Sequence, residues 1–188
     1  MRKLVYYVGA TIDGFIAAPD GSADFFPVGQ DVVDFIVGDY PDALPTHVRA
    51  QLGVDVPNPN FDVCVQGRAT YQAALDAGIT SPFPHLRQWV VSTTAGSPDP
   101  DVEIIATDLV ERIRQLKSED GKDIYLMGGS RLAGSLLAEV DSIVLKQYPV
   151  VAGAGIPLFT TGFSPTAFTL RGARTLEHGT VVLTYDRA

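Results

Sequence analysis

The sequence predicts an α/β domain in which a mixed, mostly parallel central sheet is covered by helices on both faces. Residues 89–91 and 124–127 are continuously apolar, which is typical of strands buried on both faces of a sheet. Strand patterns alternate with helical patterns through about the first 150 residues, which favours parallel crossover connections. The last two strand patterns, at 166–172 and 180–185, are close enough to form an antiparallel hairpin.

Short runs rich in Val, Tyr and Phe, bounded by Gly, Asn or Pro, predict the other strands. These runs lie at residues 4–8, 61–65, 88–92, 102–105, 123–127 and 142–148. Helical patterns span 31–38 and 68–77. Asp108, with Glu111 three residues later, predicts a capping box, and Ser130 predicts a second N-cap. The apolar stripes of these two helices contain Leu109, Ile113 and Leu116 in the first, and Leu132, Leu136, Leu137 and Val140 in the second.

The composition is that of one domain spanning residues 1–188, since 46% of the residues are hydrophobic and 19% are charged. The 14 basic and 22 acidic residues give a net charge of -8, which opposes binding to nucleic acid or to an anionic membrane. The single Cys64 cannot form an internal disulfide and indicates a reducing, cytoplasmic compartment. The first apolar run stops at Gly9, too early for a secretory signal, and no run approaches the roughly 18 apolar residues of a membrane span.

Residues 40–60 match neither the strand pattern nor the helix pattern. They contain four prolines, Pro41, Pro45, Pro57 and Pro59. One or two helical turns around residues 46–52 are the regular structure that we expect there. We therefore predict that the segment is an insertion or a lid.

Two strand ends run into glycine turns that suit anion binding. In residues 123–132 a strand passes through Gly128 and Gly129 into the helix that begins near Ser130. Glycines let backbone N–H groups approach a ligand closely, and a helix start adds partial positive charge, so a pyrophosphate fits. An ordinary tight turn explains the same residues. The sequence lacks the GxGxxG fingerprint of an ordinary Rossmann dinucleotide site.

The second turn lies at residues 65–71, where Gly67 is followed by Arg68 and Thr70. Arg68 offers a forked cation and Thr70 a hydroxyl group at a helix start, although a surface arginine is commonly just solvated. A third strand ends in the hydroxyl residues 92–94, which suit either a phosphate or a turn. Ligands of such sheets bind outside the carboxyl ends of the strands, so the two glycine turns together favour a ligand site there.

Taken in order, these motifs resemble the dihydrofolate reductase superfamily, and in particular the stand-alone relatives of the riboflavin-pathway reductase domain. Their order and spacing are more specific than any one of them, and they span nearly the whole chain. They are residues 10–17 (ATIDGFIA), 67–71 (GRATY, like GRxTW or GRxTY), the strand end at 92–93, Gly128 with Gly129, and 149–159 (PVVAGAGIPLF, like PVxxGxGxxLF). The resemblance implies a three-layer fold around about eight strands, with NADPH lying across the strand ends.

Carried over position by position, the resemblance also implies which residues bind this cofactor. Ala10 and Ile16 line the nicotinamide, Gly67, Arg68 and Thr70 hold phosphate oxygens, Ser92 and Thr93 meet the adenosine 2′-phosphate, and Gly128, Gly129, Ser130, Arg131 and Leu132 bind the pyrophosphate. Close relatives hold the peptide bond between the two adjacent glycines in the cis form. We therefore expect a cis Gly128–Gly129 bond.

Substrate residues follow from the resemblance less directly. Reductases that act on dihydropterins use a carboxylate on the helix after the first loop to assist protonation of the ring. A gapless alignment over residues 27–35 places that carboxylate at Asp31 and an aromatic substrate contact at Phe35, with Asp24 and Asp34 as alternatives. A solvated aspartate at a helix start explains Asp31 equally simply.

The leading hypothesis is an NADPH-dependent reductase that transfers hydride to a C=N or C=O bond of a small pterin-like, pyrimidine-like or sugar-derived substrate. The alternatives are the riboflavin-pathway reductase of 5-amino-6-(5-phosphoribosylamino)uracil and a nucleotide-binding protein without turnover. We expect no metal, because His47, His85 and His178 form no cluster with ligand spacing. We expect a homodimer, because relatives commonly pair and the apolar run at 181–183 needs cover.

Overall fold

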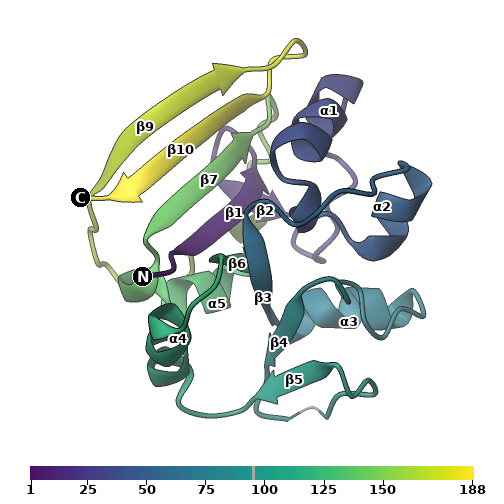
Figure 1. Cartoon of the computed structure of the whole chain (residues 1–188). Helices are drawn as coiled ribbons and strands as arrows, with labels where there is room; N and C mark the ends of the chain where they lie inside the picture. Colours follow the sequence, from purple (N-terminus) through teal and green to yellow (C-terminus); the bar gives the residue numbers. More distant parts are fainter. Residues whose placement is uncertain (95) are drawn as a thin grey trace.

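The computed structural model of the chain describes residues 1–94 and 96–188. Its main sheet consists of β1 (Leu4–Ala10), β3 (Phe61–Gly67), β4 (Arg87–Val91), β5 (Val102–Ile105), β6 (Asp123–Gly128), β7 (Ser142–Gln147), β9 (Phe168–Thr175) and β10 (Val181–Arg187). These eight strands lie in the order β5-β4-β3-β6-β1-β7-β10-β9 (Figure 1). The strands from β5 to β7 are parallel, and β10 and β9 add an antiparallel hairpin. The predicted mixed, mostly parallel sheet is confirmed.

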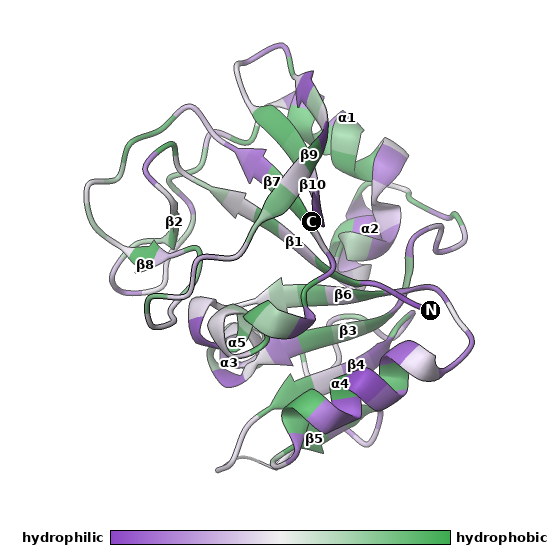
Figure 2. Ribbon diagram, turned by 90° about the vertical axis from the view of Figure 1, so that its left-hand side faces the viewer, coloured by the Kyte–Doolittle hydropathy of each residue, from purple (hydrophilic) through white to green (hydrophobic). Residues whose placement is uncertain are grey.

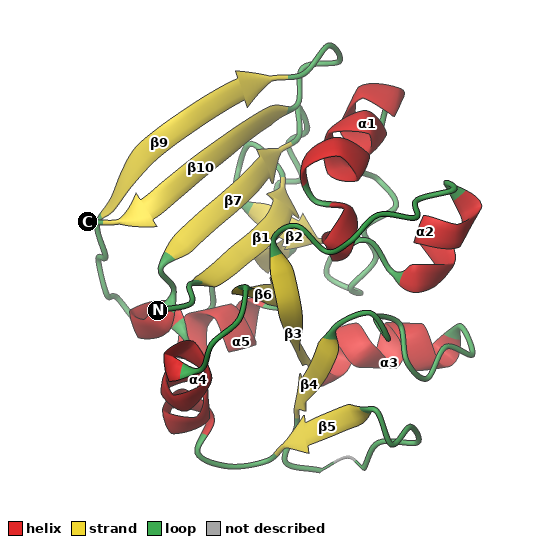
Figure 3. Cartoon of the chain, in the orientation of Figure 1, coloured by secondary structure: helices red, strands yellow, loops and turns green. Residues whose placement is uncertain are grey.

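Helices cover both faces of this sheet, as the sequence predicts (Figure 3). They are α1 (Gln30–Asp39), α2 (Thr46–Gln51), α3 (Arg68–Asp76), α4 (Leu109–Ser118) and α5 (Ser130–Ser135), with short 3₁₀ turns at Pro41–Ala43 and Leu137–Glu139. Val32 and Phe35 of α1 pack on one face, whereas Ile113 and Leu116 of α4 pack on the other. No helix within the described ranges is long and apolar enough to cross a membrane.

Side chains alternate along each strand, so the sheet presents two chemically different faces. One face packs against α4 and α5, and we call it the aliphatic face; its fully buried members include Leu4, Ile113, Leu116, Ile124, Leu126 and Leu136. The other packs against α1, and we call it the aromatic face; it contains Tyr7, Phe35, Phe61, Phe83, Tyr125 and Tyr148. Figure 2 shows the hydrophobic strands in the middle of the molecule and mixed hydrophobic and hydrophilic residues along α4.

Asp108 is the N-cap residue of α4, as predicted, but its capping box does not form, and the predicted N-cap at Ser130 is wrong. Asp108 precedes α4 in a left-handed conformation, with φ 55° and ψ 31°, and its side chain makes no capping hydrogen bond. A capping side chain reaches the first amides of a helix from an extended backbone, so the predicted capping box with Glu111 does not form. Ser130 is the first residue of α5, and Gly129 stands at the N-cap in its place.

The second of these helices is also shorter than predicted. A 3₁₀ turn at Leu137–Glu139 replaces the stretch that we predicted as helix up to Val140. Leu136 and Val140 are still fully buried, so both residues of the predicted stripe face the core although the backbone is not one continuous helix. The neighbouring chain packs closely here, because a Cβ at Gly134 would lie 1.9 Å from the carbonyl oxygen of Thr160.

The segment predicted as an insertion or lid is tied to the start of β3. Asp42 is fully buried, and its carboxylate accepts hydrogen bonds from the backbone amides of Asn60 and Phe61, both at 2.6 Å. The short helix that we expected in this segment is α2. The function of the segment stays a prediction.

A second, two-stranded sheet pairs β2 (Phe15–Ala17) with β8 (Ile156–Pro157). Strands this short have no periodicity to detect, and the sequence analysis did not predict them. Asp13 stabilises the same corner, because its carboxylate accepts hydrogen bonds from the Thr11 hydroxyl (2.6 Å) and from the two backbone amides at 152–153 (3.1 and 2.7 Å). These hydrogen bonds, led by the one from Thr11, lower the pKa of Asp13 to about 2. They fix the loop that leaves the carboxyl end of β1.

Candidate functional site

Four neighbouring parallel strands, β4, β3, β6 and β1, end at the same edge of the sheet. Their carboxyl ends lead into Ser92, Arg68, Gly129 and Thr11. Neighbouring strands lie about 4.8 Å apart, so the four ends form a row roughly 14 Å long. The topology therefore brings together residues that the sequence analysis selected from four separate parts of the chain.

The two glycine turns touch each other in the middle of this row. A Cβ at Gly67 would lie 3.6 Å from the backbone nitrogen of Gly129 and 3.7 Å from the carbonyl oxygen of Gly128. The peptide bond between Gly128 and Gly129 is cis, as the resemblance implies. A Cβ at Gly129 would meet no atom of the described residues within 4 Å, so this turn faces open space. The open space lies where a phosphate group would need close contact with the backbone.

Arg68, directly after Gly67, contributes a buried donor that lacks a partner. Its Nη2 atom donates to the side-chain oxygen of Gln72, but its Nη1 atom is buried and has no hydrogen-bond acceptor among the described residues. The Nε2 atom of Gln66, at the end of β3, is also buried and unpaired in the described part of the chain. An unsatisfied buried donor costs roughly 1–3 kcal/mol unless a ligand or water accepts from it. These two donors therefore indicate a polar ligand at this edge.

The start of α5 supplies backbone donors to the same place. The first amides of any helix lack an intrahelical acceptor, which leaves the N–H groups of Ser130, Arg131 and Leu132 for a ligand. The Ser130 hydroxyl lies 2.6 Å from the hydroxyl of Thr160, so this side chain has a structural partner and its amide is the ligand-binding part. The side chain of Arg131 is exposed and Leu132 is buried. Because α5 has only six residues, individual amides matter more here than a long helix dipole.

The far end of the row, after β4, contains the hydroxyl residues. Ser92 is buried, and its oxygen accepts a hydrogen bond from the amide of Thr94 at 3.3 Å, so Ser92 also begins a turn. Thr93 is exposed, and Thr70, in the first turn of α3, is half-buried. Both predicted explanations of the 92–94 run, a turn and a phosphate contact, are therefore compatible with its geometry.

The near end of the row, after β1, contains Ala10 and Ile16. Ala10 is 1% exposed, and its carbonyl oxygen accepts a hydrogen bond from the Tyr148 amide at 2.8 Å. A tight turn, closed by a hydrogen bond from the Thr11 amide to the Phe15 carbonyl oxygen (2.9 Å), folds β2 back toward β1. Ile16 on β2 is half-buried and packs against the aliphatic face. These apolar residues suit a flat, uncharged ring.

Asp31, the predicted catalytic carboxylate, lies in the first turn of α1 and has a structural partner. It accepts a hydrogen bond from the His178 backbone amide (2.9 Å) and lies 3.0 Å from the Nδ1 atom of the same residue. The hydrogen bond from the His178 amide is the largest cause that lowers the pKa of Asp31. An ionised carboxylate accepts hydrogen bonds but has no proton to donate at neutral pH. Its catalytic role stays a prediction.

Phe35, the predicted substrate contact, is buried on the aromatic face beneath α1. It lines a cavity of about 430 Å³ between α1 and the β9–β10 hairpin. The lining also includes Asp39, Tyr40, Arg174 and Val182. A small heterocycle is of a size that such a cavity admits.

Lys146 is the functional candidate that the sequence analysis missed. It lies on β7 and is 7% exposed. The only available signal was one charged residue in the otherwise apolar run 143–146, and the same signal marks a solvent-exposed residue in a half-buried strand. Its burial becomes visible only in the packed structure.

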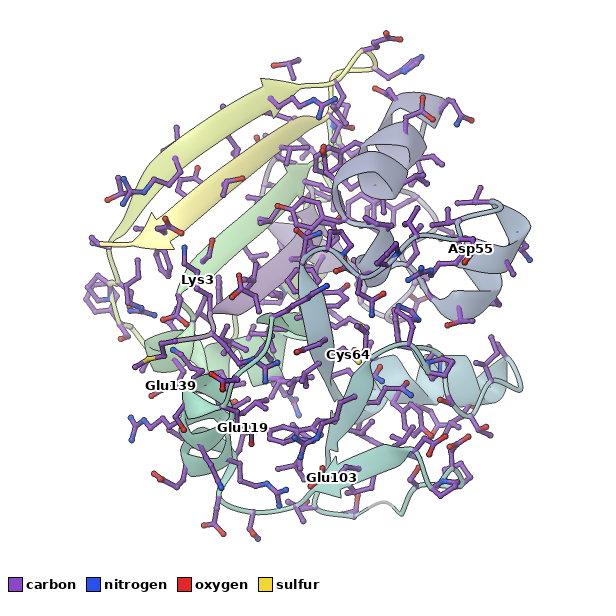
Figure 4. The ribbon with its side chains drawn as sticks, in the orientation of Figure 1. Lys3, Asp55, Cys64, Glu103, Glu119 and Glu139 are labelled. Atoms are coloured by element: carbon purple, nitrogen blue, oxygen red, sulfur yellow. The ribbon has the colours of Figure 1, made fainter. Side chains whose placement is uncertain are left out.

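The remaining candidates have structural explanations. Cys64 lies mid-strand in the sheet (Figure 4) and is fully buried, which raises the pKa of its thiol to about 12. His85 contacts the Thr46 hydroxyl at 2.8 Å and the Asp42 carbonyl oxygen at 3.0 Å. The described residues contain no group of three or more His, Cys, Asp or Glu side chains placed to hold a metal ion.

The mixed eight-stranded sheet with helices on both faces and glycine turns at adjacent strand ends defines an α/β protein of the dihydrofolate reductase-like class. The model of the RibD C-terminal domain family matches residues 72–182. The uncharacterized protein YwjB of Bacillus subtilis (strain 168) is 31% identical over 193 residues, covering 100% of this chain and 99% of YwjB. The uncharacterized protein YyaP of the same organism is 24% identical, covering 98% and 94%. The chain belongs to the RibD C-terminal domain family.

Solved structures agree on the fold. A crystal structure from Shewanella sp. PV-4, whose name places it in riboflavin biosynthesis, matches with a TM-score of 0.72 and 23% identity over 100% of this chain and 99% of that one. The Thermotoga maritima diaminohydroxyphosphoribosylaminopyrimidine deaminase/5-amino-6-(5-phosphoribosylamino)uracil reductase matches with a TM-score of 0.64 and 15% identity. This chain covers 57% of that larger protein. The family match and these neighbours agree on one fold.

Proposed function

We propose that the protein is an NADPH-dependent reductase that transfers hydride to a C=N or C=O bond of a small heterocyclic or sugar-derived substrate. The observation that carries the proposal is the row of four strand ends, which offers two kinds of donor to an extended dinucleotide. These donors are the Nη1 atom of Arg68, which has no acceptor among the described residues, and the first amides of α5. Membership of a reductase domain family supports the same chemistry.

The residues along the row fit the chemistry of this cofactor from one end to the other. Arg68, Thr70 and the amides of 129–132 would hold the phosphates, Ser92 and Thr93 would meet the 2′-phosphate, and Ala10 and Ile16 would border the nicotinamide. The open space at Gly129 accommodates a phosphate that a larger residue would displace. When bound, the cofactor supplies the hydride, and the protein orients it against the substrate.

Titration calorimetry with NADPH and NADH tests the cofactor assignment. We expect tighter binding of NADPH, because the hydroxyl groups after β4 and the Arg68 guanidinium satisfy an anion that the acidic protein otherwise repels. Arg68→Ala should weaken NADPH binding at least tenfold. Arg171→Ala, which removes an exposed arginine on the distant strand β9, is the matched control and should bind as wild type. Equal affinity for the two cofactors, or none for either, contradicts the proposal.

A second candidate is the riboflavin-pathway reduction of 5-amino-6-(5-phosphoribosylamino)uracil, which the family match favours. NADPH oxidation should be followed with this compound beside panels of pterins, aminopyrimidines and sugars. Turnover of the phosphoribosyl compound alone selects the second candidate. Tight NADPH binding without turnover of any panel compound supports the remaining alternative, a nucleotide-binding protein without enzymatic activity.

We also propose that the protein forms a homodimer through the β9 edge of the sheet. Almost every side chain of β9 is exposed, and Leu170 on it is 50% exposed. Such an edge is a template for pairing with another chain. Val182, which we expected to need this cover, is instead buried on the aromatic face, so β9 carries the proposal. Light scattering at micromolar concentration should give the mass of a dimer, and a monomer mass contradicts the proposal.

A further inference from the structure

Lys146 is buried without the partners that a buried lysine normally has. Val144 and Tyr148, two residues before and after it along the chain, both lie on the aromatic face. Residues two apart in a strand point to the same side, so the Lys146 side chain also lies on this face. Lysines are almost never fully buried unless they are paired. None of the described residues forms an ion pair or a hydrogen bond with its Nζ atom, which lies 3.5 Å from the centroid of the Tyr7 ring. This ring stabilises a cation but accepts no proton.

The neighbouring hydroxyl group is also unsatisfied. The oxygen of Tyr7 is buried and has no hydrogen-bond partner in the described ranges. The Tyr7 ring is itself held by the rings of Tyr40 (centroids 4.7 Å apart) and Tyr125 (5.8 Å). Aromatic rings therefore flank an amine and a hydroxyl group that have no hydrogen-bond partner among the described residues. Polar groups placed in this way serve a ligand or a solvent molecule better than they serve the fold.

The register of the sheet places Lys146 beside one of the residues that line the cavity beneath α1. Gly9, Lys146 and Val182 lie directly opposite one another on β1, β7 and β10. Gly9 precedes Ala10, the residue expected beside the nicotinamide, and Val182 lines the cavity of about 430 Å³. Directly opposed residues point to the same face, so the Lys146 side chain lies beside Val182, at the border of that cavity. Figure 1 shows α1 beside the ends of β7 and β10.

We propose that Lys146 is the proton donor of the reduction, acting on a substrate bound in the cavity between α1 and the β9–β10 hairpin. This inference rests on the proposed reductase function. Reduction of a C=N or C=O bond requires a proton on the nitrogen or oxygen as well as the hydride that the cofactor supplies. An Nζ–H bond of Lys146 breaks, the proton goes to that heteroatom, and the neutral amine regains a proton from solvent. The substrate is reduced and the nicotinamide is oxidised.

The protonation state of Lys146 suits this role. Burial lowers the pKa of Lys146 to about 7, so both the donor form and the regenerated amine are accessible near neutral pH. The other titratable or charged groups on the elements packed at this face are Tyr7, Tyr125, Tyr148, Cys64, Asp31, Asp39, Tyr40, Asp42 and Arg174. The Asp42 carboxylate accepts hydrogen bonds from the amides of Asn60 and Phe61. Asp39 pairs with Arg174 at 2.8 Å and Asp31 with His178, so neither carboxylate neutralises the amine. Burial raises the pKa of the four tyrosines, which keeps them neutral in the same pH range.

The first experiment asks whether a small molecule reaches the amine. The folded protein is treated with acetic anhydride at pH 7, and acetylation of Lys3, Lys117, Lys122 and Lys146 is quantified by mass spectrometry. We expect Lys146 to be acetylated faster than the exposed Lys122, because about half of its molecules are already the nucleophilic neutral amine. A Lys146 that stays unmodified while Lys122 reacts overturns the proposal, because the amine is then sealed in the core.

The second experiment compares Lys146→Met with the control Lys122→Met. With the panel compound that wild type reduces, Lys146→Met should lower kcat by about 10²- to 10⁴-fold, while the calorimetric Kd for NADPH changes less than twofold. The wild-type kcat should fall above about pH 7, and the variant should lose this dependence. The melting temperature of Lys146→Met should not fall, because the variant removes an unpaired buried charge. A variant that keeps kcat within threefold of wild type overturns the proposal.

The two experiments distinguish failure of the proposed reductase function from failure of the Lys146 assignment. If wild-type protein does not bind NADPH, the proposed function is overturned and the reductive step falls with it. If wild type binds NADPH and reduces a panel compound, but Lys146 is unreactive or its variant is fully active, only the lysine assignment is overturned. A reactive amine together with a kcat loss that leaves NADPH affinity unchanged supports the proposal.

Discussion

The aliphatic and aromatic faces of one sheet treat their buried polar groups differently. On the aliphatic face, the Tyr6 hydroxyl donates to the Leu158 carbonyl oxygen at 3.0 Å, and the Trp89 indole donates to Glu103 at 2.8 Å. On the aromatic face, the Tyr7 hydroxyl has no partner within the described ranges, and the Lys146 amine faces only a ring. Neighbouring tyrosines on β1, Tyr6 and Tyr7, thus have opposite hydrogen-bonding states on opposite sides of the sheet.

This difference separates stability from function within one fold. Satisfied polar groups among close-packed aliphatic side chains contribute to the free energy of folding. Unsatisfied polar groups lower that free energy, and natural proteins retain such groups where a ligand completes them. The aliphatic face should therefore respond to substitution mainly in stability. The aromatic face and the strand-end row should respond mainly in binding and turnover.

The largest expected effect comes from truncating the aliphatic face. Leu126, on the central strand β6, is fully buried, so Leu126→Ala should lower the free energy of unfolding by about 3 kcal/mol. Urea denaturation measures the change. Leu52→Ala removes the same atoms from an exposed position at the end of α2 and should change stability by less than about 0.5 kcal/mol. A loss below about 1 kcal/mol for Leu126→Ala would contradict the close packing of this face.

The next effect is the pH dependence of stability on the aromatic face. Burial lowers the pKa of Lys146 to about 7, so between pH 7 and pH 9 the unfolded chain holds a proton that the folded chain has released. The free energy of unfolding should therefore rise with pH in this window, by on the order of 2 kcal/mol, relative to Lys146→Met. Urea denaturation of both proteins at pH 7, 8 and 9 measures the difference. Parallel pH profiles would show that Lys146 titrates as an ordinary exposed lysine.

The third effect is on the strand-end row, where Gly129→Ala should damage cofactor binding more than folding. A Cβ there meets no described atom within 4 Å, so the melting temperature should stay unchanged. The methyl group occupies space that the pyrophosphate needs, so NADPH affinity should fall at least tenfold, about 1.4 kcal/mol. Calorimetry and thermal melting measure the two quantities. Gly162→Ala has the same open surroundings away from the row and should change neither; unchanged NADPH affinity in Gly129→Ala would remove this turn from the site.

The features that sequence alone predicted are those determined by local pattern. The strand ending at Gly67 and the strand ending at Gly128 carry their own turn signals, so both were predicted, whereas the order of the strands in the sheet was not. The predictions failed where contacts with distant parts of the chain determine the local conformation or burial. Asp108 has a good capping composition but a left-handed backbone, and Lys146 has the sequence context of a solvent-exposed residue but is buried over the Tyr7 ring. The residues of the strand-end row could therefore be predicted from motifs, whereas the polar groups buried on the aromatic face could be identified only in the packed structure.

The smallest effect concerns the helix that covers the aromatic face. Gly38 lies inside α1, and a Cβ there meets no described atom within 4 Å, so Gly38→Ala should raise the free energy of unfolding by about 0.5–1 kcal/mol through reduced chain entropy. Gly78, just after α3, has equally open surroundings but a φ of +77°, so Gly78→Ala is the matched control and should lower stability instead. Urea denaturation measures both signs, and calorimetry should find NADPH affinity unchanged in both variants. If Gly38→Ala instead weakened cofactor binding or turnover, α1 would have to move during function, and the aromatic face beneath it would not be the fixed wall that this structure shows.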